Sequence, residues 1–267
     1  MIFLRLAGGL GNQIFQLGAG LLFSEKVNCR KMLIDASALG NYDAKRENEL
    51  LKFFDFSRSD INIEFNHKCF TKFRIPKILP FIFNNYPFVS DKNFQKVLKN
   101  PNKSFILLDG YFQECLTQEN FNEEIAILKN IFMQKEIGKY DGCVIHIRGG
   151  DFVKLGWNSI TPKEYYINAM KKMVKDYNIE KFYIVTDDKK YASSILNDLD
   201  FSYEFIGSSM QDDFYLIGNF KYRILSSSTF ALWASALGDN ENSVVIAPEF
   251  WTPNVKRKIL LPHEIRI

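Results

Sequence analysis

The sequence predicts an α/β protein with two doubly wound domains, each built on a parallel sheet. The chain of 267 residues corresponds to about two domains of ~150 residues, or to one large α/β unit. Through its second half, short apolar runs alternate with amphipathic segments, a pattern typical of parallel βαβ units. The chain also opens with an apolar run, a glycine-rich turn and a helical segment.

The individual elements follow from hydrophobic periodicity and turn residues. In the first half we expect strands over residues 1–7, 31–34 and 105–108, and helices over 13–26 and 120–133. In the second half we expect strands over 143–147, 181–185, 203–206 and 243–247, helices over 162–177, 189–197 and 229–237, and a helix or loop over 212–225. Residues 41–66 give no prediction. The polar stretch 135–142 carries two glycines and is the best candidate for a linker, so the expected domains are 1–138 and 139–267.

Composition excludes several classes of protein. The 34 basic and 31 acidic residues leave a net charge of +3, which gives no reason to expect a nucleic-acid partner. The four cysteines are widely spaced without a CxxC pair, as expected of thiols in a reducing compartment and not of a zinc site. The apolar opening is broken by Gly11, Asn12 and Gln13, which argues against a cleaved signal peptide. No run approaches the ~18 apolar residues of a membrane span, so we expect a soluble, cytoplasmic protein.

A glycine-rich turn, Gly8-Gly9-Leu10-Gly11-Asn12-Gln13, lies between the first strand and the first helix. Glycines let the backbone approach a phosphate, and a helix N-terminus offers unpaired N–H groups. The spacing fits a dinucleotide loop poorly, although Asp35 lies where such a fold places its ribose-binding acid. A nucleotide-dependent oxidoreductase is therefore one alternative, and a purely structural turn is another.

The motif His146-Ile147-Arg148-Gly149-Gly150-Asp151 follows the strand expected over 143–147. Because alternate residues of a strand share a face, His146 and Arg148 are expected on the same side. The planar fork of an arginine suits a phosphate, whereas a structural Arg148–Asp151 ion pair is the simpler explanation. A lone histidine such as His146 is more often a hydrogen-bonded core residue than a catalyst.

Two further polar clusters follow strands. Thr186-Asp187-Asp188 offers carboxylates to a ribose or base, although helix capping explains one of them. Ser226 to Phe230 opens the helix expected over 229–237 and provides hydroxyl and N–H groups for a phosphate, although capping again explains one serine.

Metal and membrane sites have weaker signals. The one D-x-D pattern, Asp198-Leu199-Asp200, lies at an expected helix end and is better explained as a solvated turn, so no metal or other cofactor is expected. Residues 66–85 interleave four basic residues with phenylalanines and contain no acid. They form either a surface helix and loop or a peripheral contact with an anionic membrane carrying a lipid-linked acceptor at its inner face.

Together these motifs resemble the bacterial α-1,2-fucosyltransferases of glycosyltransferase family 11. The family's GGLGNQ-F-Q, HxRRGDY and strand-plus-SDD are matched by residues 8–16, 146–152 and 182–188, and its D-F-x-L, NS[ST]F-x-x-W and I-A-P-x-x-W by 213–216, 227–233 and 246–251. The resemblance implies a GT-B architecture of two Rossmann-like domains facing a cleft, with the donor half C-terminal. It also implies inverting, metal-independent transfer of L-fucose from GDP-fucose to the 2-hydroxyl of a terminal β-galactoside, by analogy in O-antigen or capsule synthesis.

The resemblance also implies residue roles. Arg148 would hold the β-phosphate of the leaving GDP, and Asn12 would lie near the diphosphate or the sugar; these are the two expected catalytic residues. The remaining donor-binding residues would be Gly9, Gly11, Gln13, His146, Asp151, Asp188, Ser227, Ser228, Thr229 and Phe230. Among them, His146 and Asp188 would lie around the guanosine, and Asp151 would hold the loop that aims Arg148. No residue stands out as the base.

The sequence departs from the family pattern at three positions. Gly149 replaces the second arginine of HxRRGD, Phe152 replaces its tyrosine, and Ser227 replaces an asparagine. One arginine would then do the work that two usually share. A degenerate, non-catalytic relative that binds glycans is therefore a second alternative.

Overall fold

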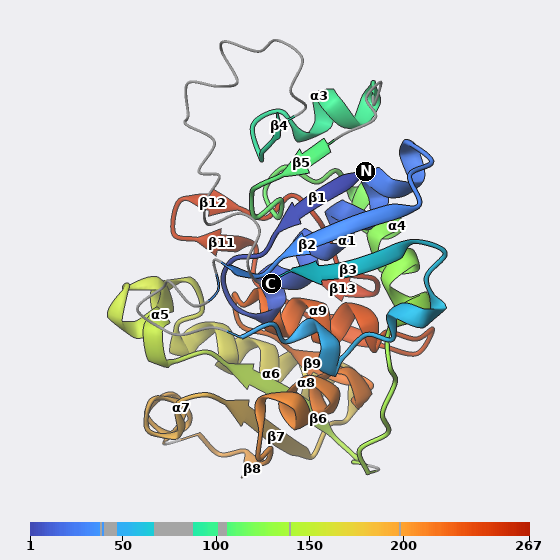
Figure 1. Ribbon diagram of the computed structural model, residues 1–267. Helices are drawn as coiled ribbons and strands as arrows, with labels where there is room; N and C mark the ends of the chain where they lie inside the picture. Colours follow the sequence, from blue (N-terminus) through green and yellow to red (C-terminus); the bar gives the residue numbers. More distant parts are fainter. Residues whose placement is uncertain (38, 40–46, 67–87, 101–105, 139, 198) are drawn as a thin grey trace. The chain divides into compact units, whose positions relative to one another are not determined.

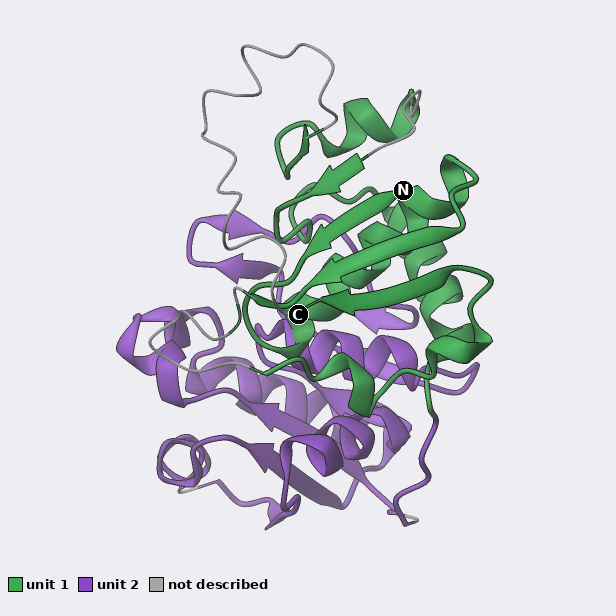
Figure 2. Cartoon of the chain, viewed as in Figure 1, with its two compact units in different colours: residues 1–133 green, residues 134–267 purple. Residues whose placement is uncertain are grey.

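The computed structural model describes residues 1–37, 39, 47–66, 88–100, 106–138, 140–197 and 199–267. The chain divides into two compact units, residues 1–133 and 134–267, which Figure 2 distinguishes by colour. The linker expected from the sequence over 135–142 begins just beyond this division. Each unit is described by itself below.

The first unit is a five-stranded parallel sheet with the strand order β3-β2-β1-β5-β4. Its strands are β1 (Ile2–Arg5), β2 (Lys31–Asp35), β3 (Asn62–Asn66), β4 (Phe88–Val89) and β5 (Ile106–Leu108). Its helices are α1 (Leu10–Lys26), α3 (Phe94–Lys99) and α4 (Gln118–Ile131), with short 3₁₀ turns η2 (Leu50–Lys52) and η3 (Phe56–Arg58) (Figure 1). The polar stretch that gave no prediction thus contains β3, an edge strand.

Helix α1 packs directly on the face of this sheet that carries Leu4 and Met32. A Cβ added at Gly20 would meet the sulfur of Met32 at 2.9 Å, so a glycine is needed for this close approach. Helix α4 lies beside α1, where Phe15 and Phe121 stack with ring centroids 6.3 Å apart. The sheet and its helices therefore bury one continuous apolar layer.

The second unit is a six-stranded parallel sheet with the order β13-β10-β9-β6-β7-β8. Its strands are β6 (Cys143–Ile147), β7 (Lys181–Thr186), β8 (Ser202–Phe205), β9 (Tyr222–Ile224), β10 (Val244–Ile246) and β13 (Glu264–Ile265), beside a hairpin of β11 (Phe250–Thr252) and β12 (Val255–Lys256). Its helices are α5 (Gly150–Lys154), α6 (Lys163–Tyr177), α7 (Lys189–Leu196), α8 (Met210–Asn219) and α9 (Thr229–Leu237), with the turn η4 (Trp157–Ile160).

The strand order of the second unit locates a ligand site. From β6 the chain moves outward to β7 and β8, then returns to the other side of β6 and moves outward through β9, β10 and β13. This is the order 3-2-1-4-5-6 of dinucleotide-binding sheets, in which ligands lie beyond the carboxyl ends of the two central strands. The loops after β6 and β9 therefore define the expected site.

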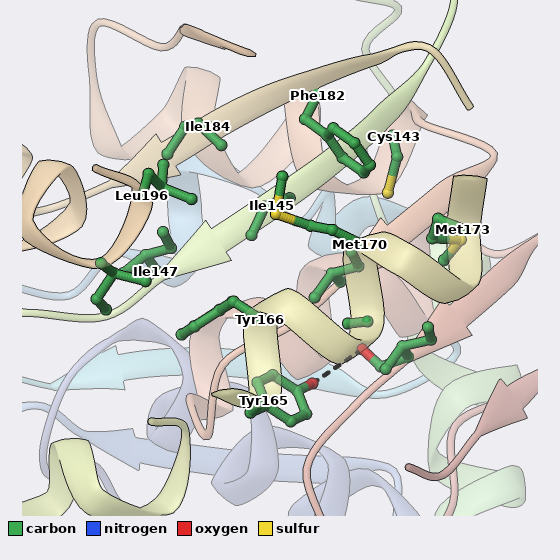
Figure 3. Packing of buried hydrophobic residues seen from close by; sticks show 14 of the residues in the cluster. Cys143, Ile145, Ile147, Tyr165, Tyr166, Met170, Met173, Phe182, Ile184 and Leu196 are labelled. Atoms are coloured by element: carbon green, nitrogen blue, oxygen red, sulfur yellow. Dashed lines mark hydrogen bonds between the residues drawn. The ribbon is translucent and has the colours of Figure 1, made fainter. Parts of the chain in front are cut away.

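Helices cover both faces of this second sheet. One face buries Ile145 and Ile147 against α6 and α7, together with Met170 and Leu196 (Figure 3). On the other side, α8 packs against α9 and against β6, and Phe214 of α8 lies edge-on to Phe230 of α9 at 5.3 Å. The fold class predicted from the sequence, an α/β protein of Rossmann-like parallel sheets of the GT-B type, is confirmed.

One element prediction was wrong: residues 212–225 are not a helix or loop throughout, because β9 occupies Tyr222–Ile224. The strand was hidden by Arg223, a charged residue that is fully buried. Its guanidinium donates to the carbonyl oxygens of Phe220, Ser235, Gly218 and Gly238 at 2.5–2.9 Å. These hydrogen bonds offset the free-energy cost of burying the guanidinium charge. Burial nevertheless lowers the pKa of Arg223 to about 10.

Candidate functional site

Arg148 follows β6 at the central position of the sheet, and its guanidinium is fixed by two carboxylates. Nη2 donates to Oδ1 of Asp151 at 2.7 Å, and Nη1 lies 2.8 Å from Oδ2 of Asp187. The ring of Phe152 lies 5.6 Å below the guanidinium carbon. The Arg148–Asp151 ion pair expected as the simpler explanation is present. The Arg148 side chain is also 25% exposed, so it is in part open to solvent.

The loop after Arg148 depends on glycine. Asp187 accepts the N–H of Gly149 at 2.8 Å, so one carboxylate holds both the backbone and the arginine. A Cβ at Gly149 would lie 2.5 Å from Cβ of Asp188. Gly150 has φ +48°, a value that favours glycine. In this geometry the position of the family's second arginine has no room for a side chain.

His146 is a buried, hydrogen-bonded link between the two central loops. It is 3% exposed, and its Nδ1 lies 2.8 Å from Oγ of Ser226, which follows β9. Burial, and then the charge of Arg148, lower the pKa of His146 to about 3, so the ring is neutral at physiological pH. Its ring lies 6.0 Å from that of Phe230. Arg148 itself lies beyond the end of β6, so the strand rule that placed it on the same face as His146 does not apply.

In the serine run that follows β9, residues 226–228, the first side chains bind other parts of the same unit. The hydroxyl of Ser227 donates to the carbonyl oxygens of Phe250 and Trp251 at 2.7 and 2.9 Å, which attaches β11 to the sheet. Ser228 is the N-cap of α9 without a side-chain capping bond, and Thr229 and Phe230 form the first turn. A small hollow opens here, lined by Leu225, Ser226, Ser227, Ser228, Leu232, Ala247, Pro248, Phe250, Trp251, Arg257 and Leu261.

The two neighbouring aspartates after β7, Asp187 and Asp188, have different hydrogen-bond partners. Asp188 caps α7 by accepting the N–H of Tyr191 at 3.0 Å, and this bond lowers the pKa of its carboxyl. Asp187 instead turns toward Arg148 and Gly149. Sequence reasoning left Asp187 and Ser226 out of the site, although both belong to motifs that it identified.

Asp213 was also left out of the predicted site. Burial, and then the charges of Asp212 and Asp187, raise the pKa of Asp213 to about 6.

The other predicted residues lie in the first unit, in the turn after β1. Gly9 is the N-cap of α1, and Gly11 is buried within its first turn. Asn12 packs over Gly8, which has φ +78°. Gln13 is fully buried; it donates to the carbonyl oxygen of Glu47 at 2.9 Å and accepts the N–H of Glu49 at 3.1 Å.

The structure therefore brings together Arg148, Asp151, His146, Asp188, Ser227, Ser228, Thr229 and Phe230 at one edge of the second sheet. Gly9, Gly11, Asn12 and Gln13 lie together in the first unit, at the start of α1.

Several sequence predictions fall outside this geometry. Residues 67–85 of the basic segment and Asp198 of the D-x-D pattern lie outside the described residues. Within the described part of the chain, no three His, Cys, Asp or Glu side chains gather as a metal site would require. Cys29 and Cys143 are free thiols. None of the helices that the structure describes has the length and apolarity to cross a membrane.

Solved structures share the fold of this chain, and a family model that matches most of its length shows the family. The fucosyltransferase NodZ from Bradyrhizobium, solved as an α-1,6-fucosyltransferase soaked with GDP-fucose, superposes with a TM-score of 0.58 at 14% identity, covering 88% of this chain and 91% of that one. The α-1,2-colitosyltransferase of Escherichia coli is 27% identical over 275 aligned positions, or 92% of this chain and 91% of that protein. The O-antigen biosynthesis glycosyltransferase WbnK of Escherichia coli is 24% identical over 98% of this chain and 99% of its own length. The model of glycosyl transferase family 11 matches residues 2–259, and the chain is a member of this family of glycosyltransferases.

Proposed function

We propose that this glycosyltransferase moves L-fucose from GDP-fucose to the 2-hydroxyl of a terminal β-galactoside, with inversion and without a metal ion. The observation that carries the proposal is the guanidinium of Arg148. It stands at the carboxyl end of the central strand β6, accessible and fixed by Asp151 and Asp187. The alternative of a non-catalytic relative rested on the loss of an arginine at Gly149, and the intact Arg148 arrangement weighs against it.

The chemistry needs positive charge where GDP departs. Transfer passes through an oxocarbenium-like state, and negative charge grows on the β-phosphate as the glycosidic bond breaks. A guanidinium held in place beforehand stabilises that charge without reorganising during the reaction. The N–H groups that begin α9 at Thr229 and Phe230 are suited to the same diphosphate.

The aspartates that hold Arg148 also determine how readily its guanidinium can bind a diphosphate. Both ends of the guanidinium face carboxylates, so a diphosphate competes with Asp151 or Asp187 for its N–H groups. Asp151 is the more exposed of the two, at 49% of its side chain against 32%. We expect Asp151 to yield to the phosphate while Asp187, which also holds Gly149, stays in place.

The name of one relative suggests a second candidate for the sugar-nucleotide donor. One of them is named a colitosyltransferase, and colitose is fucose without its 3-hydroxyl. GDP-colitose is therefore the alternative donor. The name of the second relative supports a place in O-antigen synthesis, where the galactoside acceptor would be lipid-linked and segment 66–85 would contact the membrane's inner face.

The test is GDP release from GDP-fucose and from GDP-colitose, with EDTA present, across a panel of β-galactosides. Arg148→Ala should lower kcat about 10²–10³-fold, the usual effect of removing one charge-stabilising donor. The matched control is Arg58→Ala, which breaks an exposed Arg–Asp pair of the same i,i+3 spacing in the first unit. Galactoside-dependent release that survives EDTA and depends on Arg148 supports the proposal. Equal rates for both variants, or release that EDTA abolishes, would refute it.

A further inference from the structure

The loop that follows β5 in the first unit is held in a strained conformation. Phe112 is fully buried and has φ +63°, a value that bulky side chains rarely adopt. The carboxylate of Asp91 accepts the N–H of Tyr111 at 3.2 Å and that of Phe112 at 2.6 Å. A Cβ at Gly110 would collide with the same carboxylate. Strain of this kind persists only where the surroundings impose it, and it clusters at ligand sites.

The strain determines which side chains face solvent. Because Phe112 is locked inward, the preceding Tyr111 is directed outward and is 42% exposed. Asp109, two residues earlier, has 35% of its side chain exposed. An outward tyrosine supplies a rigid apolar ring with a polar tip, and few rotamers are lost when it binds a ligand.

Arg5 and Asp109 lie together because β1 and β5 are neighbouring parallel strands. Leu4 pairs with Leu108, so the next residues, Arg5 and Asp109, leave the sheet side by side. Nη1 of Arg5 donates to Oδ2 of Asp109 at 2.6 Å. Within the described residues, Nη2 of Arg5 and Oδ1 of Asp109 make no hydrogen bond. A donor and an acceptor are thus presented next to each other.

A buried carboxylate stands behind this pair. Asp35 is 1% exposed, and its Oδ2 has no hydrogen-bond partner among the described residues; it lies 3.9 Å from Nε of Arg5. Arg5 therefore faces two carboxylates, and the cluster with Asp109 carries a net negative formal charge. An anionic ligand is disfavoured here, whereas a neutral one is not.

Gln16 makes the loops after β1 and β5 one rigid piece. It is 1% exposed; its Oε1 accepts the N–H of Ala7 at 2.9 Å, and its Nε2 donates to the carbonyl oxygen of Gly110 at 3.1 Å. Both loops leave the carboxyl edge of the sheet, where open α/β sheets bind ligands. The groups around Asp109 are therefore preorganised.

We infer that Arg5, Asp109 and Tyr111 form the subsite that holds the terminal pyranose ring of the acceptor glycoside. Sugar hydroxyls donate and accept at once, so vicinal hydroxyls match an adjacent guanidinium N–H and carboxylate oxygen. The C–H face of the ring would pack on the exposed ring of Tyr111. In taking this sugar to be the acceptor, the inference rests on the proposed function.

Two variants and two matched controls test the subsite. Tyr111→Ala removes an exposed side chain, and Asp109→Asn removes the charge of an ion-paired acid. Their controls are Leu51→Ala, an exposed apolar residue of the same unit, and Asp60→Asn, which faces Arg30 at 3.8 Å. Binding of methyl β-galactoside and other methyl hexopyranosides is measured by saturation-transfer-difference NMR in the presence of GDP. Acceptor KM is measured in the transfer assay.

We expect Tyr111→Ala to raise the acceptor KM about tenfold, the effect of losing one aromatic contact, and to weaken the NMR signal in parallel. Asp109→Asn should act in the same direction, and both controls should match the native chain. A galactoside signal that both variants retain would overturn the inference, as would no signal from any glycoside with the native chain. If the variants lose the signal while the native chain turns over neither donor, the subsite stands and the proposed function fails.

Discussion

The buried carboxyl of Glu124 lies at the contact between α4 and α1. It is fully buried, and a Cβ at Gly18 would meet its Oε2 at 2.8 Å. Neither carboxylate oxygen has a hydrogen-bond partner among the described residues. Burial, and then the charge of Glu123, raise the pKa of Glu124 well above its usual range. Burial therefore favours the protonated form of this carboxyl in the native protein.

This shift predicts how stability changes with pH. Because the folded-state pKa of Glu124 exceeds the unfolded value of about 4.3, its contribution to stability is complete below that pH and is lost as pH rises through the folded pKa. Glu124→Gln removes this loss, so its stability advantage over the native chain should grow with pH. Urea unfolding between pH 5 and 8 measures it. Glu119→Gln, an exposed residue of the same helix, is the control, and parallel curves for native and Glu124→Gln proteins would contradict the prediction.

The two aspartates after β7 show which property of single residues cannot be predicted from the sequence: the partner of each side chain. Asp187 and Asp188 are chemically identical, and a pattern after a strand indicates only that one of them caps the next helix. The backbone directs Asp188 to the N–H of Tyr191 and Asp187 to Arg148. Arg148 could be found from the sequence because two glycines follow it at the end of an apolar run, whereas its pairing with Asp187 depends on the pairing of β6 with β7.

At the scale of elements, Gln16 connects α1 to the loop after β5. Gln16→Leu keeps the side chain's size but leaves the N–H of Ala7 and the carbonyl of Gly110 without their partner. Two partly buried polar groups without partners should lower the free energy of unfolding by about 2 kcal/mol. Equilibrium urea unfolding measures this loss. Gln118→Leu, on the surface at the start of α4, should change it by less than about 0.5 kcal/mol. Equal effects of the two substitutions would contradict the assigned role of Gln16.

Elements with clear periodicity or an uninterrupted apolar run could be predicted from the sequence, including the three-residue strands β5 and β10, whereas some other short elements could not. Helix α6 begins one residue after its predicted start because Pro162 takes the N-cap position. Strand β9 was missed because Arg223 interrupts its apolar run, and its burial depends on carbonyl oxygens from α8 and α9. Strand β13 is two residues long and forms only by pairing with β10. Such pairing is non-local and leaves no periodic signal in the sequence.

For the whole molecule, the predicted donor site and the predicted acceptor subsite belong to different units. The second unit carries the strand order that predicts a ligand site beside Arg148, and the first carries the strained loop with Tyr111. Asn12, the second expected catalytic residue, lies in the first unit at the start of α1. Its predicted place is near the diphosphate or the sugar, and ligands with and without the sugar distinguish these two possibilities.

Hydrogen exchange with three ligands tests this division. A ligand that binds the native state protects the backbone N–H groups that it orders. GDP should slow exchange in residues 148–151 and 226–232, GDP-fucose should add protection in 8–13, and methyl β-galactoside with GDP should protect 109–112. ADP at the same concentration is the control for the nucleotide, because only the base differs. If GDP and ADP protect the same segments equally, guanine is not recognised. If the loops after β6 and β9 exchange equally with and without GDP, the nucleotide site is misplaced, and protection of 109–112 by GDP alone would assign the strained loop to the donor.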